Sequence, residues 1–156
     1  MKKLIGSALL VFVTVLFLTG CGSSKDNNFV CTYSSDQSAS GYKLKSEYKV
    51  YSDGEIVNKV VTVETVESTN TSVLSYFESA LKEQYKSNDN KYGGYSYNIT
   101  KTDDTVISEV TIDYTKMDIE KFIEDNEAVK AYVNDDNQLT VEGVKKMYKS
   151  IGATCK

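Results

Sequence analysis

The side chains that most often perform acid–base or nucleophilic chemistry are scarce in this sequence. It contains no histidine, so the commonest general base is missing and neither a Ser–His nor a Cys–His pair can form. Two adjacent aspartate pairs, Asp103-Asp104 and Asp135-Asp136, lie in predicted turns, where solvated turn residues are the favoured interpretation. We therefore predict a protein that is not an enzyme and has no catalytic residues. A carboxylate-dependent envelope hydrolase is a less favoured alternative, since the fold would have to bring two acids within about 5–9 Å.

Metal ligands are equally sparse. Cys31 and Cys155 are far apart in the chain, and without histidine they do not make a usual zinc set. Residues 134–142 lack the alternating ligands, the central glycine and the spacing of an EF-hand calcium loop. The sequence therefore predicts neither a metal nor a cofactor.

The N-terminal residues have the pattern of an export signal. Lys2 and Lys3 precede an apolar run over residues 4–18, which is too short for a comfortable bilayer span. The run ends in Leu18-Thr19-Gly20-Cys21, which resembles the bacterial lipobox, in which the cysteine is lipidated and becomes the first residue. This resemblance implies that residues 1–20 are removed and that Cys21 carries the lipid, such as palmitate and related acyl chains. An ordinary secretory signal is the alternative.

The residues after this cysteine indicate the location of the protein. Residues 21–28 are small and polar and are expected to form a flexible tether from the lipid on Cys21. Acyl chains bury about 0.8 kcal/mol per methylene, which anchors a protein stably without a spanning helix. We expect the cell envelope, on the outer side of the cytoplasmic membrane, or the outer membrane if the cell has one. Loss of Lys2 and Lys3 changes the net charge from −4 to −6, which argues against nucleic acid as a partner.

Cys31 and Cys155 remain once Cys21 is assigned to lipid. In an exported protein, an even remainder of cysteines favours a disulfide. Such a bridge would tie the first predicted strand to the C-terminus. The alternative is two buried or free thiols.

Alternating polarity predicts the strands of the domain. The segment 42–50 has the period of a half-buried strand, Asp53-Gly54 is a hairpin turn, and residues 56–67 return as a strand rich in Val and Thr. A short strand is expected over residues 29–34, and a second hairpin over residues 95–114.

Helical spacing predicts the remaining elements. A helix is expected over residues 72–86, and Thr115 to Asp118 resembles a capping box that starts a short second helix. Residues 127–133 are ambiguous between helix and strand, and residues 141–151 have the stripe of a last helix. Residues 153–156 would then lie back along the sheet.

Together, these elements predict one α+β domain over residues 29–156. It would contain a single antiparallel β-sheet, built from two hairpins and the first short strand, with two or three helices packed on one face.

Two stretches, together with the lipobox, carry a resemblance to a known family. The segments Val110-Thr-Ile-Asp-Tyr-Thr-Lys-Met-Asp118 and Leu139-Thr-Val-Glu-Gly-Val-Lys-Lys-Met-Tyr-Lys-Ser-Ile-Gly152 resemble the YehR-like family of small bacterial lipoproteins. The resemblance implies an α+β lipoprotein domain of this size. It implies no biochemical activity and does not imply the Cys31–Cys155 bridge.

Two sets of side chains are candidates for contact with a partner. The tyrosines Tyr92, Tyr95 and Tyr97 flank Gly93-Gly94 and are expected to pack, although exposed rings can also bind sugars or proteins. Lys43, Lys45 and Lys49 share one strand face with Glu47, and a solvated face is favoured over binding to an acidic glycopolymer or lipid headgroups.

The leading hypothesis is a membrane-anchored lipoprotein that binds or scaffolds a partner, such as an envelope protein or glycopolymer. A cell-surface module that contacts host or neighbouring cells is the alternative. The sequence leaves the ligand and the oligomeric state open.

Overall fold

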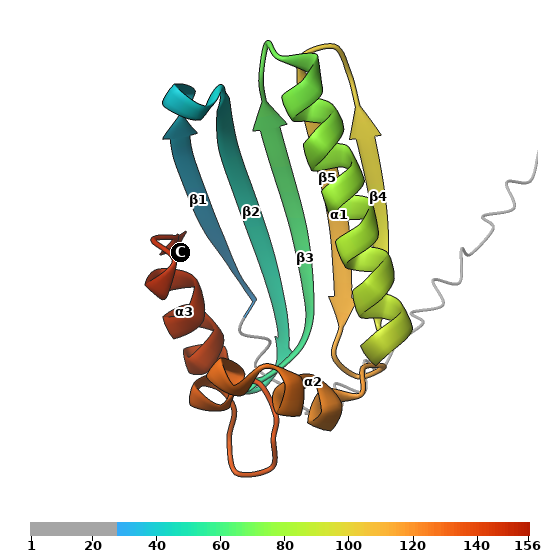
Figure 1. Cartoon of the computed structure of the whole chain (residues 1–156). Coiled ribbons are helices and arrows are strands. Elements are labelled where there is room, and N and C mark those ends of the chain that lie inside the picture. Colours follow the sequence, from blue (N-terminus) through green and yellow to red (C-terminus); the bar gives the residue numbers. More distant parts are fainter. Residues whose placement is uncertain (1–27) are drawn as a thin grey trace, which may run out of the picture.

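The computed structural model describes residues 28–156. The predicted export signal and the predicted lipidation residue Cys21 lie outside these residues. The described chain forms six strands, three α-helices and two 3-10 helices (Figure 1). In chain order they are β1 (Phe29–Gln37), η1 (Ser38–Ser40), β2 (Tyr42–Asp53), β3 (Ile56–Glu67), α1 (Thr71–Tyr92), β4 (Tyr95–Lys101), β5 (Thr105–Asp113), α2 (Ile119–Asp125), η2 (Glu127–Tyr132), α3 (Val141–Ser150) and β6 (Thr154–Cys155).

All the strands belong to one antiparallel sheet in the order β4-β5-β3-β2-β1-β6. The predicted fold class is thereby confirmed. The C-terminal residues do lie back along the sheet, since β6 pairs with β1 at its outer edge.

Both long helices lie on the same face of the sheet (Figure 1). Helix α3 packs on β1, β2 and β3 through a cluster that includes Val50, Val60 and Val144. Helix α1 packs near the other end of β3 and on β5 through Leu74, Val66 and Val106. Strand β3 therefore contributes to both apolar clusters.

Two predicted boundaries were wrong. Strand β1 continues to Gln37 because its backbone pairs with β2 along its whole length, which outweighs the polar composition after Ser34. Helix α1 continues to Tyr92, whose buried ring packs edge-on against Phe122 with ring centroids 5.2 Å apart. Gly93, with φ of 69°, then ends the helix.

The two segments after β5 also differ from expectation. Helix α2 is capped by Asp118, whose carboxylate accepts a hydrogen bond from the Lys121 amide at 3.1 Å, and not by Thr115. The Thr115 hydroxyl instead donates to Asp113. The ambiguous segment 127–133 is mostly the 3-10 helix η2.

None of the helices formed by residues 28–156 is long and apolar enough to cross a membrane.

Candidate functional site: the uncovered face of the sheet

The face of the sheet opposite the helices carries no covering element among the described residues (Figure 1). Because side chains alternate between faces along a strand, the register places every second residue of the central strands on this face. We call it the uncovered face. Its residues on β1, β2, β3 and β5 include Val30, Thr32, Ser34, Asp36, Lys43, Lys45, Glu47, Lys49, Val61, Val63, Thr65, Glu67, Thr105, Ile107, Glu109 and Thr111.

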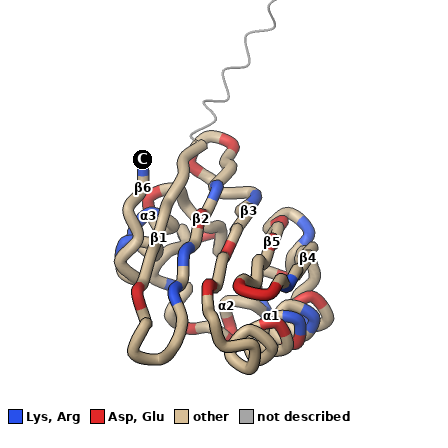
Figure 2. The backbone as a smooth tube through the Cα atoms, turned by 90° about the horizontal axis from the view of Figure 1, so that it is seen from above, with Lys and Arg blue, Asp and Glu red and all other residues tan. Residues whose placement is uncertain are grey.

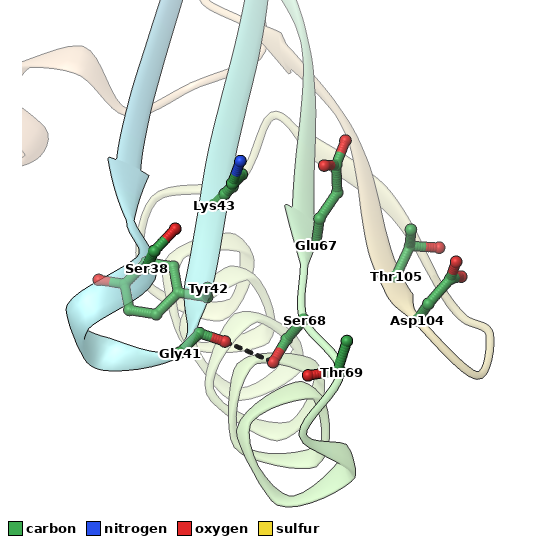
Figure 3. Close-up of a pocket in the computed structure, with 9 residues that line it drawn as sticks. All are labelled: Ser38, Gly41, Tyr42, Lys43, Glu67, Ser68, Thr69, Asp104 and Thr105. Carbon is green, nitrogen blue, oxygen red and sulfur yellow. Dashed lines mark hydrogen bonds between the residues drawn. The ribbon is translucent and has the colours of Figure 1, made fainter.

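A hollow of about 530 Å³ lies at one end of this face, and we call it the end hollow (Figure 3). The β3–α1 loop holds its walls together: the Ser68 hydroxyl donates to the Gly41 carbonyl at 2.6 Å, and the Ser68 amide donates to the Asp104 carbonyl at 2.9 Å. Its lining residues are Ser38, Gly41, Tyr42, Lys43, Glu67, Ser68, Thr69, Asp104 and Thr105.

A second hollow, of about 550 Å³, adjoins the first on the same face, and we call it the side hollow. Its lining includes Lys45 of β2 and Thr65 of β3. On this face of the sheet, these two residues are the direct neighbours of Lys43 and Glu67, which line the end hollow. Its full lining is Thr32, Tyr33, Ser34, Lys45, Ser46, Glu47, Val63, Thr65, Gly152 and Thr154. The two hollows thus lie over neighbouring rows of residues, and Ser and Thr are the commonest residues in their linings.

The lysines of the uncovered face are paired with neighbouring acids. The ion-pair distances are 3.2 Å for Lys43–Asp36, 2.6 Å for Lys45–Glu67 and 3.2 Å for Lys49–Glu47. In Figure 2, the basic positions along β2 have acidic positions close by on the neighbouring strands, without a large patch of one sign. The predicted row of lysines exists, but its charge is locally neutralised.

Asp36 is held in its charged form beside the end hollow. Its carboxylate accepts hydrogen bonds from the hydroxyl and the amide of Ser38 and also faces Lys43. Both hydrogen bonds lower the pKa of Asp36 below its ordinary value, and the bond from the Ser38 hydroxyl has the larger effect.

The predicted acid pairs lie in separate turns. Asp104 borders the end hollow and accepts a hydrogen bond from the Thr102 hydroxyl at 3.0 Å. In the other turn, the Asn134 side chain accepts hydrogen bonds from the Asp136 and Gln138 amides. Within residues 28–156, no group of three or more Cys, Asp or Glu side chains is placed to hold a metal ion.

Cys31 and Cys155 lie opposite one another on β1 and β6. Their sulfur atoms are at disulfide distance, 1.97 Å, and the pair joins residues 124 positions apart. Val30 and Lys156 exchange both backbone hydrogen bonds. The cysteines therefore occupy the neighbouring, non-hydrogen-bonded position of the ladder, where side chains of antiparallel strands come closest.

The three predicted tyrosines have different environments. Tyr92 is buried and Tyr95 is half-buried, where burial raises the pKa of its phenol to about 12. Tyr97 is 37% exposed, with its ring 5.9 Å from that of Tyr85 on α1. Packing thus accounts for Tyr92, whereas Tyr95 and Tyr97 are partly accessible to solvent, and Tyr97 is the more exposed of the two.

A polar row on the helix-covered face, with two buried serines and the half-buried Glu64, was missed by the sequence analysis. Ser46, Glu64 and Ser108 lie side by side on β2, β3 and β5. The Ser46 and Ser108 residues are 4% and 0% exposed, and their hydroxyl oxygens have no hydrogen-bond partner within the described part of the chain. One clue was available in the sequence. Every second residue from 42 to 50 is apolar or aromatic except Ser46, which places a polar side chain on the face that packs against the helices.

Helix α1 reaches this polar row through Tyr85. Its hydroxyl donates to the Glu64 carboxylate at 3.1 Å. Burial raises the pKa of Glu64, and this hydrogen bond opposes part of the rise. The pKa of the Tyr85 phenol is also raised, first by burial and then by the Glu64 charge.

Comparison with known proteins shows where this fold occurs elsewhere. No family model and no curated protein sequence matches the chain. The solution structure of the Escherichia coli YehR protein, a structural genomics target, is similar with a TM-score of 0.54 and 18% identity, over 84% of this chain and 92% of that one. The solution structure of a protein from Streptococcus pneumoniae TIGR4 aligns with a TM-score of 0.47 and 13% identity, over 100% of this chain and 96% of that one. At these identities, the similarity to the YehR structure shows that the two chains share a fold.

Proposed function

We propose that this chain is a lipid-anchored lipoprotein of the cell envelope and that its domain binds a ligand without catalysing a reaction. The proposal includes membership of the YehR-like family. It is supported by the lipobox around Cys21, by the segments that resemble that family and by the shared fold with the YehR structure.

The observation that carries the binding role is the pair of adjoining hollows on the uncovered face. An antiparallel sheet commonly leaves one face solvated, and on this one two hollows lie over neighbouring rows of residues. The hollows are wide and open, which suits an extended ligand better than a small molecule that must be enclosed.

The ligand class follows from the lining. Every lysine of the hollows has an acidic partner, so a polyanion would have to compete with Asp36 and Glu67. The remaining lining groups are mainly Ser and Thr hydroxyls, which donate and accept hydrogen bonds. We therefore propose a neutral, hydroxyl-rich segment of an envelope glycopolymer as the ligand.

Lipidation is tested by growing cells with radiolabelled palmitate. The wild-type chain should incorporate the label, and the Cys21→Ser chain should not. The absence of label from the wild-type chain would contradict the anchored protein, whatever the domain binds.

Ligand binding is tested with glycan strands isolated from the envelope of the producing cell. The Thr65→Arg variant places a long side chain in the side hollow and should reduce co-sedimentation with the glycan about tenfold, equivalent to 1.4 kcal/mol. Thr111→Arg, which lies on the same face but lines neither hollow, is the matched control. Equal binding by both variants would reject the two hollows as the site.

A further inference from the structure

Strand β4 forms one edge of the sheet, and part of its backbone is unpaired. Gly94 and Thr102, just outside the two ends of β4, bond toward β5 through Asp113 and Thr105. By alternation, the even residues between them also bond to β5, and the odd residues direct their N–H and C=O groups outward. The Tyr95 amide donates to Asp89 at 3.2 Å. In the described chain, the outward backbone groups of Tyr97 and Ile99 have no partner.

This edge lacks the features that usually prevent pairing with another strand. Exposed edges are commonly protected by bulges, prolines, charged side chains or covering segments. Strand β4 has no proline, pairs with β5 in an unbroken register and carries no charge before Lys101. At the opposite edge of the sheet, β1 is partly covered by β6.

A third hollow, of about 600 Å³, runs along this edge. Helix α1 forms one side of it and β4 forms the other, including the part-exposed ring of Tyr97. The lining residues are Ser79, Lys82, Glu83 and Lys86 from α1 and Tyr97, Asn98 and Ile99 from β4.

The helix residues of this hollow are arranged symmetrically about its middle. Lys101 contacts Ser75 and Glu78, and the Tyr97 ring contacts Tyr85, so α1 runs antiparallel to β4. The chain rises about 1.5 Å per residue in a helix and about 3.3 Å per residue in a strand. Counted from the contact between Tyr97 and Tyr85, Asn98 therefore lies beside the part of α1 that contains Lys82 and Glu83. A twofold axis at Asn98 would therefore place Lys82, which is ion-paired with Glu78 of its own helix at 2.7 Å, opposite Glu83 of a second copy, and Glu83 opposite the Lys82–Glu78 pair of that copy.

We propose that two copies of this chain pair edge to edge through β4. In this antiparallel pair, Tyr97 exchanges backbone hydrogen bonds with Ile99 of the partner subunit, and the two Asn98 residues face each other across the twofold axis. Strands lie about 4.8 Å apart, and α1 packs over β4 and β5, so the two α1 helices would lie about 8–10 Å apart, the usual packing distance. Charge complementarity between the helices is the reason for choosing a second copy over an unrelated peptide.

This pairing extends the proposed function. A twofold axis perpendicular to the sheet keeps both uncovered faces on the same side of the paired sheet. One glycopolymer could then contact two sites, which increases binding through effective concentration. The dimer does not depend on that function, because its contacts involve only β4 and α1.

Cysteine crosslinking of the full-length chain in intact cells tests the pairing. In the Asn98→Cys variant, the two thiols would face each other at a non-hydrogen-bonded position, and mild oxidation should give a reducible band at twice the chain mass. Thr100→Cys is the register control, because position 100 would face Ser96 of the partner subunit, and Ser34→Cys is the control on the other exposed edge. A band of equal strength in all three variants, or in none, would overturn the proposal.

Two further measurements distinguish a second copy of this chain from another partner and test the dimer in solution. An Asn98→Cys adduct of a different mass would identify another protein at this edge and reject the second copy. Light scattering of the purified, detergent-solubilised chain should give a dimer mass for the wild type and its loss in Asn98→Lys, where like charges would oppose each other. A monomeric wild type would overturn the dimer without affecting the glycan-binding test, and circular dichroism would verify that Asn98→Lys is folded.

Discussion

Glu64 is the residue whose environment departs most from its chemical preference. It lies on the helix-covered face between two serine residues whose buried hydroxyls have no hydrogen-bond partner among residues 28–156, and its carboxylate accepts a hydrogen bond from the Tyr85 hydroxyl. Burying such groups costs stability, so this row weakens the centre of a face that is otherwise apolar. The row also separates the two apolar clusters under α1 and α3.

The Glu64→Gln variant should change the pH dependence of stability. Because burial raises the pKa of Glu64 above its ordinary value of 4.5, the native state binds this proton more tightly than the unfolded chain does. The free energy of unfolding therefore falls as the pH rises from the ordinary pKa through the raised one. Urea titrations from pH 4 to pH 8 should show that Glu64→Gln loses part of this fall, whereas Glu124→Gln, at an exposed position of α2, retains it. An unchanged pH profile in Glu64→Gln would contradict the role given to burial.

The Cys31→Ser variant should lower stability through the loss of the cross-link. Chain entropy for a separation of 124 residues gives an upper effect of about 4–5 kcal/mol. The measurement is the urea midpoint of the oxidised wild type, the reduced wild type and the variant. If the bridge is present, the reduced protein should resemble the variant; equal midpoints for all three would mean that the thiols are free.

Among the elements, α3 shows how a helix position can be constrained by a neighbouring backbone. Thr140 caps this helix by accepting the Gly143 amide at 3.0 Å, and Gly143 faces the carbonyl oxygen of Tyr132 in η2. A β-carbon at position 143 would overlap that oxygen and the Thr140 side chain. The short segments η2 and α3 are therefore packed backbone to backbone at this point.

Gly143→Ala should destabilise the protein although alanine favours helices. Alanine gains about 1 kcal/mol in helix propensity over glycine, but crowding in a packed region typically costs about 1–3 kcal/mol. Chemical denaturation should show a net decrease in the free energy of unfolding. Lys146→Ala, on the exposed side of the same helix, should stay within about 0.5 kcal/mol of the wild type. An increase in stability in Gly143→Ala would show that η2 moves freely away from α3.

Across the whole molecule, β3 is the element that joins the two apolar clusters. Val60 packs in the cluster under α3, and Val66 packs in the cluster under α1. Since β3 contributes residues to both clusters, unfolding of either cluster would remove packing contacts from the other. We expect the domain to unfold in one cooperative step despite the polar row at its centre.

Leu74→Ala tests this cooperativity. Leu74 belongs to α1 and is fully buried between this helix and the sheet. Its truncation should lower the free energy of unfolding by about 2–5 kcal/mol. Far-ultraviolet circular dichroism should report the same transition as the near-ultraviolet signal of the stacked Tyr48 and Tyr148 rings, which lie 4.2 Å apart in the other cluster. Tyr76→Ala, at a 70% exposed position of the same helix, is the control. Separate transitions in the Leu74→Ala protein would show that the clusters unfold independently.

Local patterns were sufficient for most of the fold. Alternation along residues 42–50 and 56–67, the Asp53-Gly54 turn and the helical spacing after Ser72 depend on neighbouring residues, and their strands and helices were predicted correctly. The continuation of β1 to Gln37 and of α1 to Tyr92 depends on partners distant in the chain, which local propensity does not contain.

The candidate site depended almost entirely on long-range pairing. The lysines of β2 were visible in the sequence, but their neutralisation by Asp36 and Glu67 follows from the register between three strands. The same holds for the buried row, because Ser46, Glu64 and Ser108 become neighbours only when β2, β3 and β5 align. Composition and short motifs thus determine the export-signal pattern, the absence of histidine from the sequence and the fold class, since these are properties of residue types and local order. The hollows, the half-buried Glu64 carboxylate and the open edge of β4 arise from strand order and register, which bring together residues that no local pattern connects.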